Sequence, residues 1–370
     1  RKTVYIIMRD ENEYRLFCDD GKRIYIYLIE DIEEFLDFIN IEELYTTQQE
    51  AVRNDMKRII LFLLALTILV GCDNQEKTLR LLHWNIQNGM WSDQGNNYDN
   101  FVEFVKSENP DICVWAEAES RYRTDTNVKM ETREEVYLPY NWDLLARRYG
   151  HEYVVYVGKR DTFPQVITSK YPVRIVDRIN GNGDDIIVVH GSGHAQVDVN
   201  GQIINFITVH TYPFKYAYRA EDQKKSAEEQ GGDVFRATEM KHICEESILK
   251  HDPEGKQMWM LVGDFNAIAR TDNDHYQRAE DDKCFMLHDY IDANTPFIDV
   301  MKRWYPNEFQ KSTFSGRRID FMYVTEPLFE KITRAETIWD GFATASRDPR
   351  KLSNFCNPSD HYPLVVDIAL

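Results

Sequence analysis

The sequence predicts an α/β fold in which mixed β-sheets pack together and helices cover them from outside. Strand-like apolar runs are interleaved with rather few helix-like segments along the 370 residues, of which 43% are apolar. This proportion favours packed mixed sheets over a doubly wound parallel sheet. Residues 195–209 read as a β-hairpin that turns on Asn200-Gly201.

The predicted strands are short apolar runs bounded by turn residues or polar side chains. They cover residues 78–86, 111–117, 152–158, 164–170, 184–191, 194–201, 202–210, 257–264, 317–324 and 362–370. Apolar residues at helical spacing predict helices over 98–110, 140–150 and 233–250. Residues 212–232 form the least regular stretch, a polar loop that could flank a functional site.

Residues 56–71 resemble a secretory signal peptide that lies inside the chain. A Met, a Lys and an Arg open this segment, and a mostly apolar run follows. That run is too short for a transmembrane helix, which needs about 20 residues. The motif LVGC (residues 69–72) resembles the bacterial lipobox, which implies lipidation of Cys72. An uncleaved signal anchor or a buried core helix is the alternative.

The residues before this signal are acidic and have some folding potential. Residues 3–10 and 22–29 alternate apolar and polar side chains and flank a DDG turn, which predicts a hairpin. Residues 30–44 read as an amphipathic helix. We prefer to explain this extension by a start site assigned too far upstream, and a small cytoplasmic domain is the alternative. The predicted segments are the extension 1–55, the signal 56–71, a tether 72–78 and one domain over 79–370.

The formal net charge is −18, which argues against a protein that grips nucleic acid through a broad basic face. The sequence also lacks a lysine- or arginine-rich arm for tracking DNA. The negative charge is compatible with an enzyme that binds phosphate through a metal ion, because the cation changes the local electric field.

A set of polar residues follows or interrupts the predicted strands. A charged group in such a place costs several kcal/mol, roughly, unless it is paired or bound to an ion. One such residue has the ordinary explanation of a turn or a cap, but this many in one domain predict that they converge on one site. The set comprises Asn85, Glu117, His210, Asp264, Asn266, Asp320, Asp360 and His361.

These residues lie in motifs that resemble the endonuclease/exonuclease/phosphatase superfamily, which includes deoxyribonuclease I, apurinic endonucleases, sphingomyelinases and inositol polyphosphate 5-phosphatases. GDFNA (263–267) and SDHYPL (359–364) are the most specific motifs, and WNIQNG, PDICVWAE, SKYPV and RRIDFMYV add the correct order. The resemblance runs from about residue 79 to residue 370. It implies a four-layer sandwich of two facing mixed β-sheets flanked by helices, with the site at one end.

The resemblance also implies a hydrolase that cleaves a phosphodiester or phosphomonoester with Mg²⁺, or with Mn²⁺ in its place. Glu117 is the implied principal ligand of the metal, with Asn85 beside it. Asp360 matches the family's acid before its histidine, which is a metal ligand or a neighbour of one. These residue types agree with the implied metal, because Mg²⁺ prefers oxygen ligands and keeps several waters.

The other residues of the set receive catalytic roles from the resemblance. His361 is the implied catalytic histidine, and Asp320 orients its ring and stabilises its charged form. Asp264 positions or deprotonates the attacking water or helps to hold the metal. Asn266 hydrogen-bonds the phosphate, because positions two apart on an extended strand face the same side and reach one phosphorus. His210 matches a second histidine that contacts the substrate and protonates the leaving oxygen.

Three further histidines and two cysteines receive no such role. We interpret His190 and His194 as structural or peripheral, and the role of His83 stays open. Cys284 and Cys356 lie in loop-like sequence, where an exported protein could form a disulfide.

Two classes of function follow from these observations. The first is a phosphoester hydrolase, exported and anchored to a bacterial cell envelope through lipidated Cys72, on its periplasmic or surface face. Its substrate could be a small molecule, a lipid headgroup or a nucleic acid, and the acidic charge disfavours a dedicated DNA or RNA endonuclease. The second is a catalytically silent lipoprotein that uses the fold for ligand binding, against which the intact polar set argues. We expect a monomer.

Overall fold

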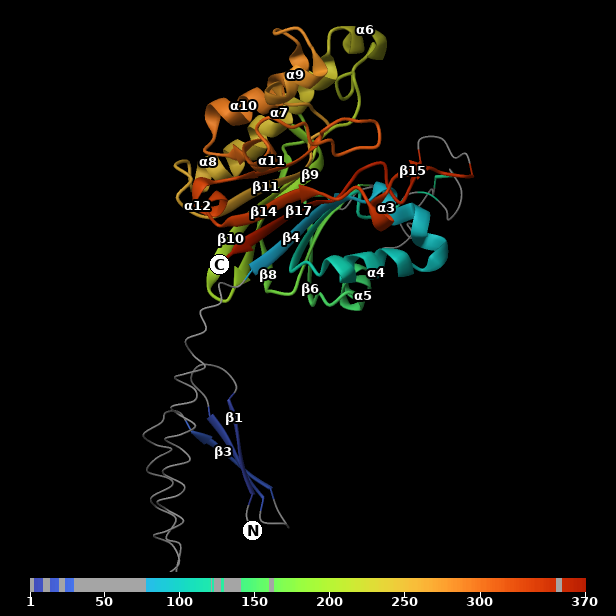
Figure 1. Cartoon of the computed structure of the whole chain (residues 1–370). Coiled ribbons are helices and arrows are strands. Elements are labelled where there is room, and N and C mark those ends of the chain that lie inside the picture. The colour runs from blue at the N-terminus through green and yellow to red at the C-terminus, as the bar shows by residue number, and fades with distance from the viewer. Residues whose placement is uncertain are drawn as a thin grey trace, which may run out of the picture. The chain divides into compact units, whose positions relative to one another are not determined.

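The computed structural model describes residues 3–8, 14–19, 24–29, 78–120, 122, 128–129, 141–159, 163–350 and 355–370. The chain divides into two compact units, residues 1–75 and 76–370 (Figure 1). The expected helix over 30–44, the signal over 56–71 and Cys72 lie outside the described residues. None of the described helices is long and apolar enough to cross a membrane.

The first unit contains a three-stranded antiparallel sheet in the order β1-β2-β3. Its strands are β1 (Thr3–Met8), β2 (Tyr14–Asp19) and β3 (Ile24–Ile29). The hairpin predicted between residues 3–10 and 22–29 is wrong, because β2 lies between these two strands and pairs with both. The sequence of β2, YRLFCD, breaks the strict alternation of apolar and polar residues, and periodicity therefore did not reveal it.

The second unit contains two six-stranded β-sheets. The first sheet has the order β14 (Ile332–Thr337), β17 (Leu364–Ala369), β4 (Thr78–Asn85), β5 (Ile112–Ala116), β7 (Gln165–Ser169) and β6 (Tyr153–Val157). The second has the order β12 (Ile298–Asp299), β13 (Asp320–Val324), β11 (Trp259–Asp264), β10 (Gln202–His210), β9 (Ile187–Val199) and β8 (Val173–Gly181). Both sheets are mixed, since β4 pairs with β5 and β10 with β11 in parallel among antiparallel neighbours. A separate ladder joins β15 (Ser346–Arg347) to β16 (Cys356–Asn357).

Helices cover the outer faces of the two sheets (Figure 1). On the first sheet lie α4 (Asp99–Glu108) and α5 (Trp142–Arg148), and on the second lie α7 (Gly231–Glu246) and α10 (Met286–Asn294). The remaining helices are short: α3 (Gln87–Met90), η1 (Trp91–Asn96), α6 (Gln223–Glu228), α8 (Ile248–His251), η3 (Arg270–Asp272), α9 (Asn273–Tyr276), η4 (Lys283–Phe285), α11 (Val300–Trp304), α12 (Glu326–Phe329) and η5 (Gly341–Ala343).

The alternation of side chains along each strand produces the layers. In β4, Leu81 belongs to the central core between the sheets, whereas Leu82 packs outward in a cluster with Phe101 of α4. In β11, Val262 belongs to the same central core and Leu261 packs outward toward α7 and α10. Successive residues of a strand point to opposite faces, so strands that are apolar throughout can support a layer on each side. The predicted four-layer α/β sandwich is confirmed.

Several elements differ from the sequence prediction. The strands predicted over 184–191 and 194–201 form one strand, β9, because Gly193 lies inside the ladder rather than in a turn. A Cβ at position 193 would lie 2.2 Å from a methyl group of Val157, so the glycine serves close packing. Helix α6 lies inside the predicted loop 212–232. The prediction also missed β8, β12, β14, α10 and α11.

Gly263 permits the close approach of β10 and β11. Its φ is +154°, and a Cβ at this position would lie 1.8 Å from the backbone oxygen of Val209. An alanine must therefore push the two strands apart. We expect Gly263→Ala to lower the free energy of unfolding by about 3 kcal/mol, as overpacking of a core does, measured by chemical denaturation.

The matched control is Gly316→Ala, where φ is also positive, +83°, but nothing lies within 4 Å of the new Cβ. This variant should lose only about 1 kcal/mol, the cost of the backbone conformation. Equal losses in the two variants would contradict the steric explanation.

Candidate active site

Three residues of the predicted set lie side by side on neighbouring strands of the second sheet. His210 ends β10 and is paired in register with Asp264, which ends β11. Asp264 is paired in turn with Asp320, the first residue of the antiparallel strand β13. All three are buried. The strand register therefore brings residues from three separate motifs to one edge of the sheet.

Asn85 connects the two sheets at this edge. It ends β4 of the first sheet, and its Nδ2 donates a hydrogen bond to Asp264 Oδ2 on the second sheet at 3.0 Å. The same Nδ2 lies 3.4 Å from Glu117 Oε1. Glu117 follows β5 with φ of +51°, and its other carboxylate oxygen accepts a hydrogen bond from Asn88 N at 2.9 Å. Asn85, Glu117 and Asp264 thus form one connected polar group.

His361 forms a close pair with Asp320. Its Nδ1 lies 2.8 Å from Asp320 Oδ2, and its Nε2 lies 3.8 Å from Asp264 Oδ2. Asp320 Oδ2 also accepts a hydrogen bond from Ser312 Oγ at 2.7 Å, and Asp320 Oδ1 lies 3.3 Å from His83 Nε2. The carboxylate of Asp320 is therefore held from several sides, and it fixes the ring of His361.

The segment that carries His361 is tied to strand β4. Ser359 Oγ donates a hydrogen bond to Asn85 O at 2.7 Å and accepts one from His361 N at 3.1 Å. The indole Nε1 of Trp84 donates to His361 O at 2.9 Å. These bonds position the histidine backbone directly beside the end of β4.

The site has the electrostatics of an imidazolium–carboxylate pair. Burial favours a neutral His361, but three nearby carboxylates, Asp320 foremost, outweigh burial and raise the pKa of His361 well above its ordinary value. Burial opposes the ionised form of Asp320, but His361 and His83 outweigh it and lower the pKa of Asp320. Burial raises the pKa of Glu117, and the hydrogen bond from Asn88 N partly opposes this shift. A cation beside Glu117 would favour its ionised form.

His210 lies next to His190, for which the sequence predicted a structural or peripheral place. The two imidazole rings stack with centroids 4.5 Å apart and an interplanar angle of 16°. His210 Nε2 lies 4.0 Å from Asp264 Oδ2, and Phe163 packs edge-on against both rings. His190 therefore belongs to the wall of the site. His194 is buried within the second sheet, with its Nε2 2.9 Å from Asn205 Oδ1.

Asn266 lies in a turn after β11 and not on the extended strand that the sequence predicted. Strand β11 ends at Asp264, and Asn266 adopts a left-handed conformation with φ of +46°, so the extended-strand argument for a shared face is wrong. Asn266 N donates to Asp264 Oδ1 at 2.8 Å, and Asn266 Nδ2 donates to Thr211 O at 3.1 Å. The turn itself, rather than strand alternation, sets the position of the amide.

The donor set at this edge fits a hard divalent cation, because carboxylate and amide oxygens prevail. Ligand atoms of Asp264, Asp320 and His361 all lie within 4.8 Å of one another. Asp320 and His361 are already bonded to each other. The oxygens of Glu117 and Asn85 accept hydrogen bonds from neutral N–H groups, and a carboxylate or amide oxygen has a second lone pair that could bind a cation. The amide of Asn85 must turn for its Oδ1 to face a cation, because its Nδ2 points at the carboxylates.

Asp360, the third predicted ligand, lies near the same ring nitrogen of His361 as Asp264 does. Its Oδ1 is 3.9 Å from His361 Nε2, and its side chain is 42% exposed. Asp360 therefore adjoins the imidazole ring from a more open position than Asp264, whose side chain is only 2% exposed.

Some residues of the site were not singled out from the sequence. Ser312 lies outside the quoted motifs, whereas Ser359 and Asn88 lie inside SDHYPL and WNIQNG but received no role; all three act through hydrogen bonds. The open question about His83 is answered by its contact with Asp320, and its place two positions before Asn85 was the available signal. The disulfide between Cys284 and Cys356 is wrong: both cysteines are free, and Cys356 is buried.

The model of the Endonuclease/Exonuclease/phosphatase family matches residues 82–361. No curated protein matches the chain. Among solved structures, an AP endonuclease from Archaeoglobus fulgidus shares 17% sequence identity with a TM-score of 0.51, over 79% of this chain and 100% of that one.

Two further solved structures show a similar sequence identity and coverage. A 3′ phosphatase from Neisseria, bound to a product DNA hairpin, shares 16% identity with a TM-score of 0.48, over 79% of this chain and 100% of its own. An endonuclease/exonuclease/phosphatase family protein from Bacteroides thetaiotaomicron shares 16% identity with a TM-score of 0.49, over 79% of this chain and 97% of its own. Since the family model spans most of the chain and its motifs converge on one site, this protein belongs to the endonuclease/exonuclease/phosphatase family.

Proposed function

We propose that the protein is a Mg²⁺-dependent phosphoesterase that hydrolyses a phosphodiester or phosphomonoester by in-line attack of an activated water. Members of the family are hydrolases of phosphoester bonds. The observation that carries the proposal is the convergence of the His361–Asp320 pair with Asp264, Asn85 and Glu117 at one buried edge. Such a set offers both acid–base groups and oxygen ligands within one small space.

The metal would be held by Glu117 and Asn85, with Asp360 as a further ligand or a neighbour of one, and Mn²⁺ could replace Mg²⁺. When bound, the cation would withdraw charge from the phosphoryl oxygens and favour attack at phosphorus. The chain's own contribution is the placement of Glu117, whose partly buried carboxylate has a raised pKa and would be stabilised in its ionised form by a nearby positive charge.

The remaining residues would orient the reactants and move protons. Asp264 lies 3.8 Å from His361 Nε2 and would accept a proton from the attacking water or align it. His361, held protonated by Asp320, would donate toward the negative charge that develops on phosphate. Asn266 uses one amide hydrogen on Thr211 O and has a second for a phosphate oxygen. His210 would give the proton that the leaving oxygen requires.

The test is an activity assay on the purified full chain with Mg²⁺. The substrates are an aryl phosphodiester, an aryl phosphomonoester, phospholipid vesicles and plasmid DNA, and the last distinguishes a nuclease from the other branches. We expect EDTA to abolish turnover and His361→Ala to lower kcat by about 10²–10⁴-fold, as the loss of an acid–base group does.

His242→Ala is the matched control, since His242 lies on α7 away from the site and should keep full activity. No hydrolysis of any of the four substrates, together with no Mg²⁺ binding in calorimetry, would contradict the proposal. It would leave the fold as a ligand-binding scaffold.

The His361–Asp320 pair predicts a change in pH dependence. Asp320→Asn keeps the shape of the side chain but removes the strongest influence that raises the pKa of His361. Burial then lowers that pKa, so the protonated imidazole is lost at a lower pH. We expect the alkaline limb of kcat/KM to move down by about 1 pH unit or more. A slower enzyme with an unmoved alkaline limb would exclude protonated His361 from the reaction.

We also propose that the protein is anchored to the bacterial cell envelope through Cys72, on the basis of the signal-like segment 56–71 and the LVGC motif. In cells fed an alkyne-labelled fatty acid, the wild-type chain should carry the label and sediment with membranes. Cys72→Ala should lose the label, whereas Cys284→Ala should retain it. Equal labelling of all three chains would refute lipidation at this cysteine.

A further inference from the structure

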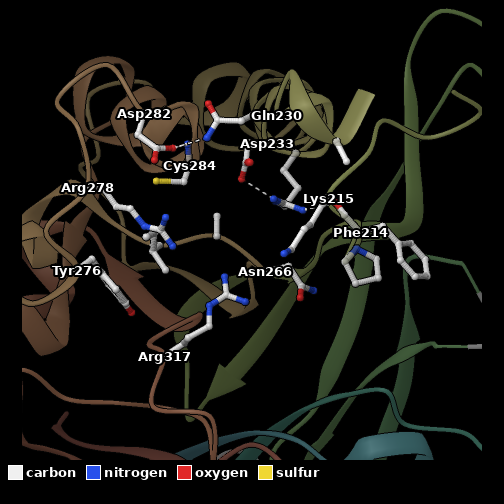
Figure 2. A pocket seen from close by; sticks show the side chains of 15 residues that line it. Phe214, Lys215, Gln230, Asp233, Asn266, Tyr276, Arg278, Asp282, Cys284 and Arg317 are labelled. Carbon is white, nitrogen blue, oxygen red and sulfur yellow. Dashed lines mark hydrogen bonds and ion pairs between the residues drawn. The ribbon is translucent and has the colours of Figure 1, made fainter. Parts of the chain in front are cut away.

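A cavity of about 490 Å³ adjoins the candidate active site on the side of Asn266. The loop after β10, the start of α7, residues 276–284 and the turn before β13 line it. Asn266 itself is part of this wall, so the cavity and the proposed phosphate position share a residue (Figure 2).

Three cationic side chains converge in this cavity. Lys215, Arg278 and Arg317 come from separate segments and point toward its centre (Figure 2). Within the described part of the chain, none of the three side chains forms an ion pair or a hydrogen bond. In contrast, the neighbouring Arg318 is buried and paired with Asp272 and Asp299. All three side chains are exposed, and unpaired cations gathered at one place in a chain of net charge −18 can attract an anionic ligand.

The carboxylates of the cavity are already engaged. Asp233 is paired with Arg236, and Asp282 Oδ1 accepts hydrogen bonds from Gln230 Nε2 and Cys284 N. Arg236 is itself 5% exposed, and its Nε has no hydrogen-bond partner. Four cations line the cavity against these two carboxylates, so its net charge is positive: Lys215, Arg236, Arg278 and Arg317.

The backbone segments that carry these cations are fixed by hydrogen bonds. Lys215 O accepts a hydrogen bond from Gly232 N at 2.9 Å, so the loop after β10 is tied to α7. The side-chain amide of Asn273 bonds both the N and the O of Arg278, at 2.8 and 3.1 Å. Arg317 is the last residue of the turn 312–317, and its backbone oxygen accepts a hydrogen bond from Ser312 N at 2.8 Å. Preorganised loops reduce the entropy lost on binding.

We propose that this cavity binds a second phosphate group of a small phosphoester whose scissile phosphate lies beside Asn266 and His361. This inference rests on the proposed function. Guanidinium groups match phosphate oxygens in geometry and charge, and a lysine adds a point charge. The limited volume of the cavity and the acidic molecule around it favour a compact bisphosphate over a polynucleotide.

The test is a binding titration that does not require turnover. His361→Ala full chain with Mg²⁺ is titrated calorimetrically with α,ω-alkanediol bisphosphates of two to six carbons and with the alkyl monophosphates of equal length. We expect the bisphosphate of one optimal length to bind at least tenfold more tightly, roughly the effect of one or two charge-assisted contacts.

Variants then assign this advantage to the cavity. In the same background, Arg317→Gln and Lys215→Gln should each reduce the bisphosphate advantage by about fivefold. Arg303→Gln removes an exposed arginine that is paired with Glu326 at another place, and it should leave the advantage unchanged. Equal binding of mono- and bisphosphates at every length, or an advantage that survives both cavity variants, would overturn the proposal.

A further arm distinguishes the source of the second phosphate. A tetrathymidylate should bind no more tightly than the best alkanediol bisphosphate. Tighter binding that depends on Arg317 would overturn the small-substrate assignment and indicate a nucleic-acid backbone. If the bisphosphate advantage is found but no substrate is turned over, the proposed hydrolysis fails while the binding site stands. If turnover occurs without the advantage, only the second phosphate site fails.

Discussion

The register of strands β10, β11 and β13 is the constraint on which the site depends. It places His210, Asp264 and Asp320 in one row across the end of the second sheet. A slip of one residue would turn each side chain to the opposite face and bury the wrong half of every strand. The apolar residues between the two sheets therefore fix this row as firmly as they fix the core, and Gly263 allows the close strand contact that the row requires.

The first sheet contributes the other half of the site through the ends of β4 and β5. Asn85 reaches across to Asp264, and Ser359 joins the backbone of β4 to the segment that carries His361. The buried hydrogen bonds leave these polar groups few alternative partners, so the two sheets cannot shift independently without leaving charges unpaired. The charge of the site thus depends on sheet packing, since burial alone would favour neutral His361 and only the facing carboxylates reverse this preference.

Much of the architecture could be predicted because apolar runs and polar strand ends are local features of the sequence. The fold class, the hairpin at Asn200-Gly201 and the grouping of Asp264 with His361 all depended on such patterns. The missed features depend on distant partners. His190 acquires its place only by stacking on His210, and β2 is defined by pairing with a strand on each side. Hydrophobic periodicity also does not predict left-handed backbone conformations. Asn266 adopts one, so strand alternation did not predict how its side chain is placed at the site.

The turn 312–317 connects the proposed catalytic pair to the cationic cavity. At one end, Ser312 bonds Asp320, and Thr313 forms a bridge with His361. At the other end Arg317 lines the cavity. The next residue, Arg318, is held by two buried carboxylates, so the turn is anchored immediately beyond the cavity. The spacing between the two sites is therefore set by the protein and not by its ligand. If both sites bind phosphate as proposed, a fixed spacing would select a substrate with two anionic groups at a matching separation, because a mismatched one would gain only one of the two sets of contacts.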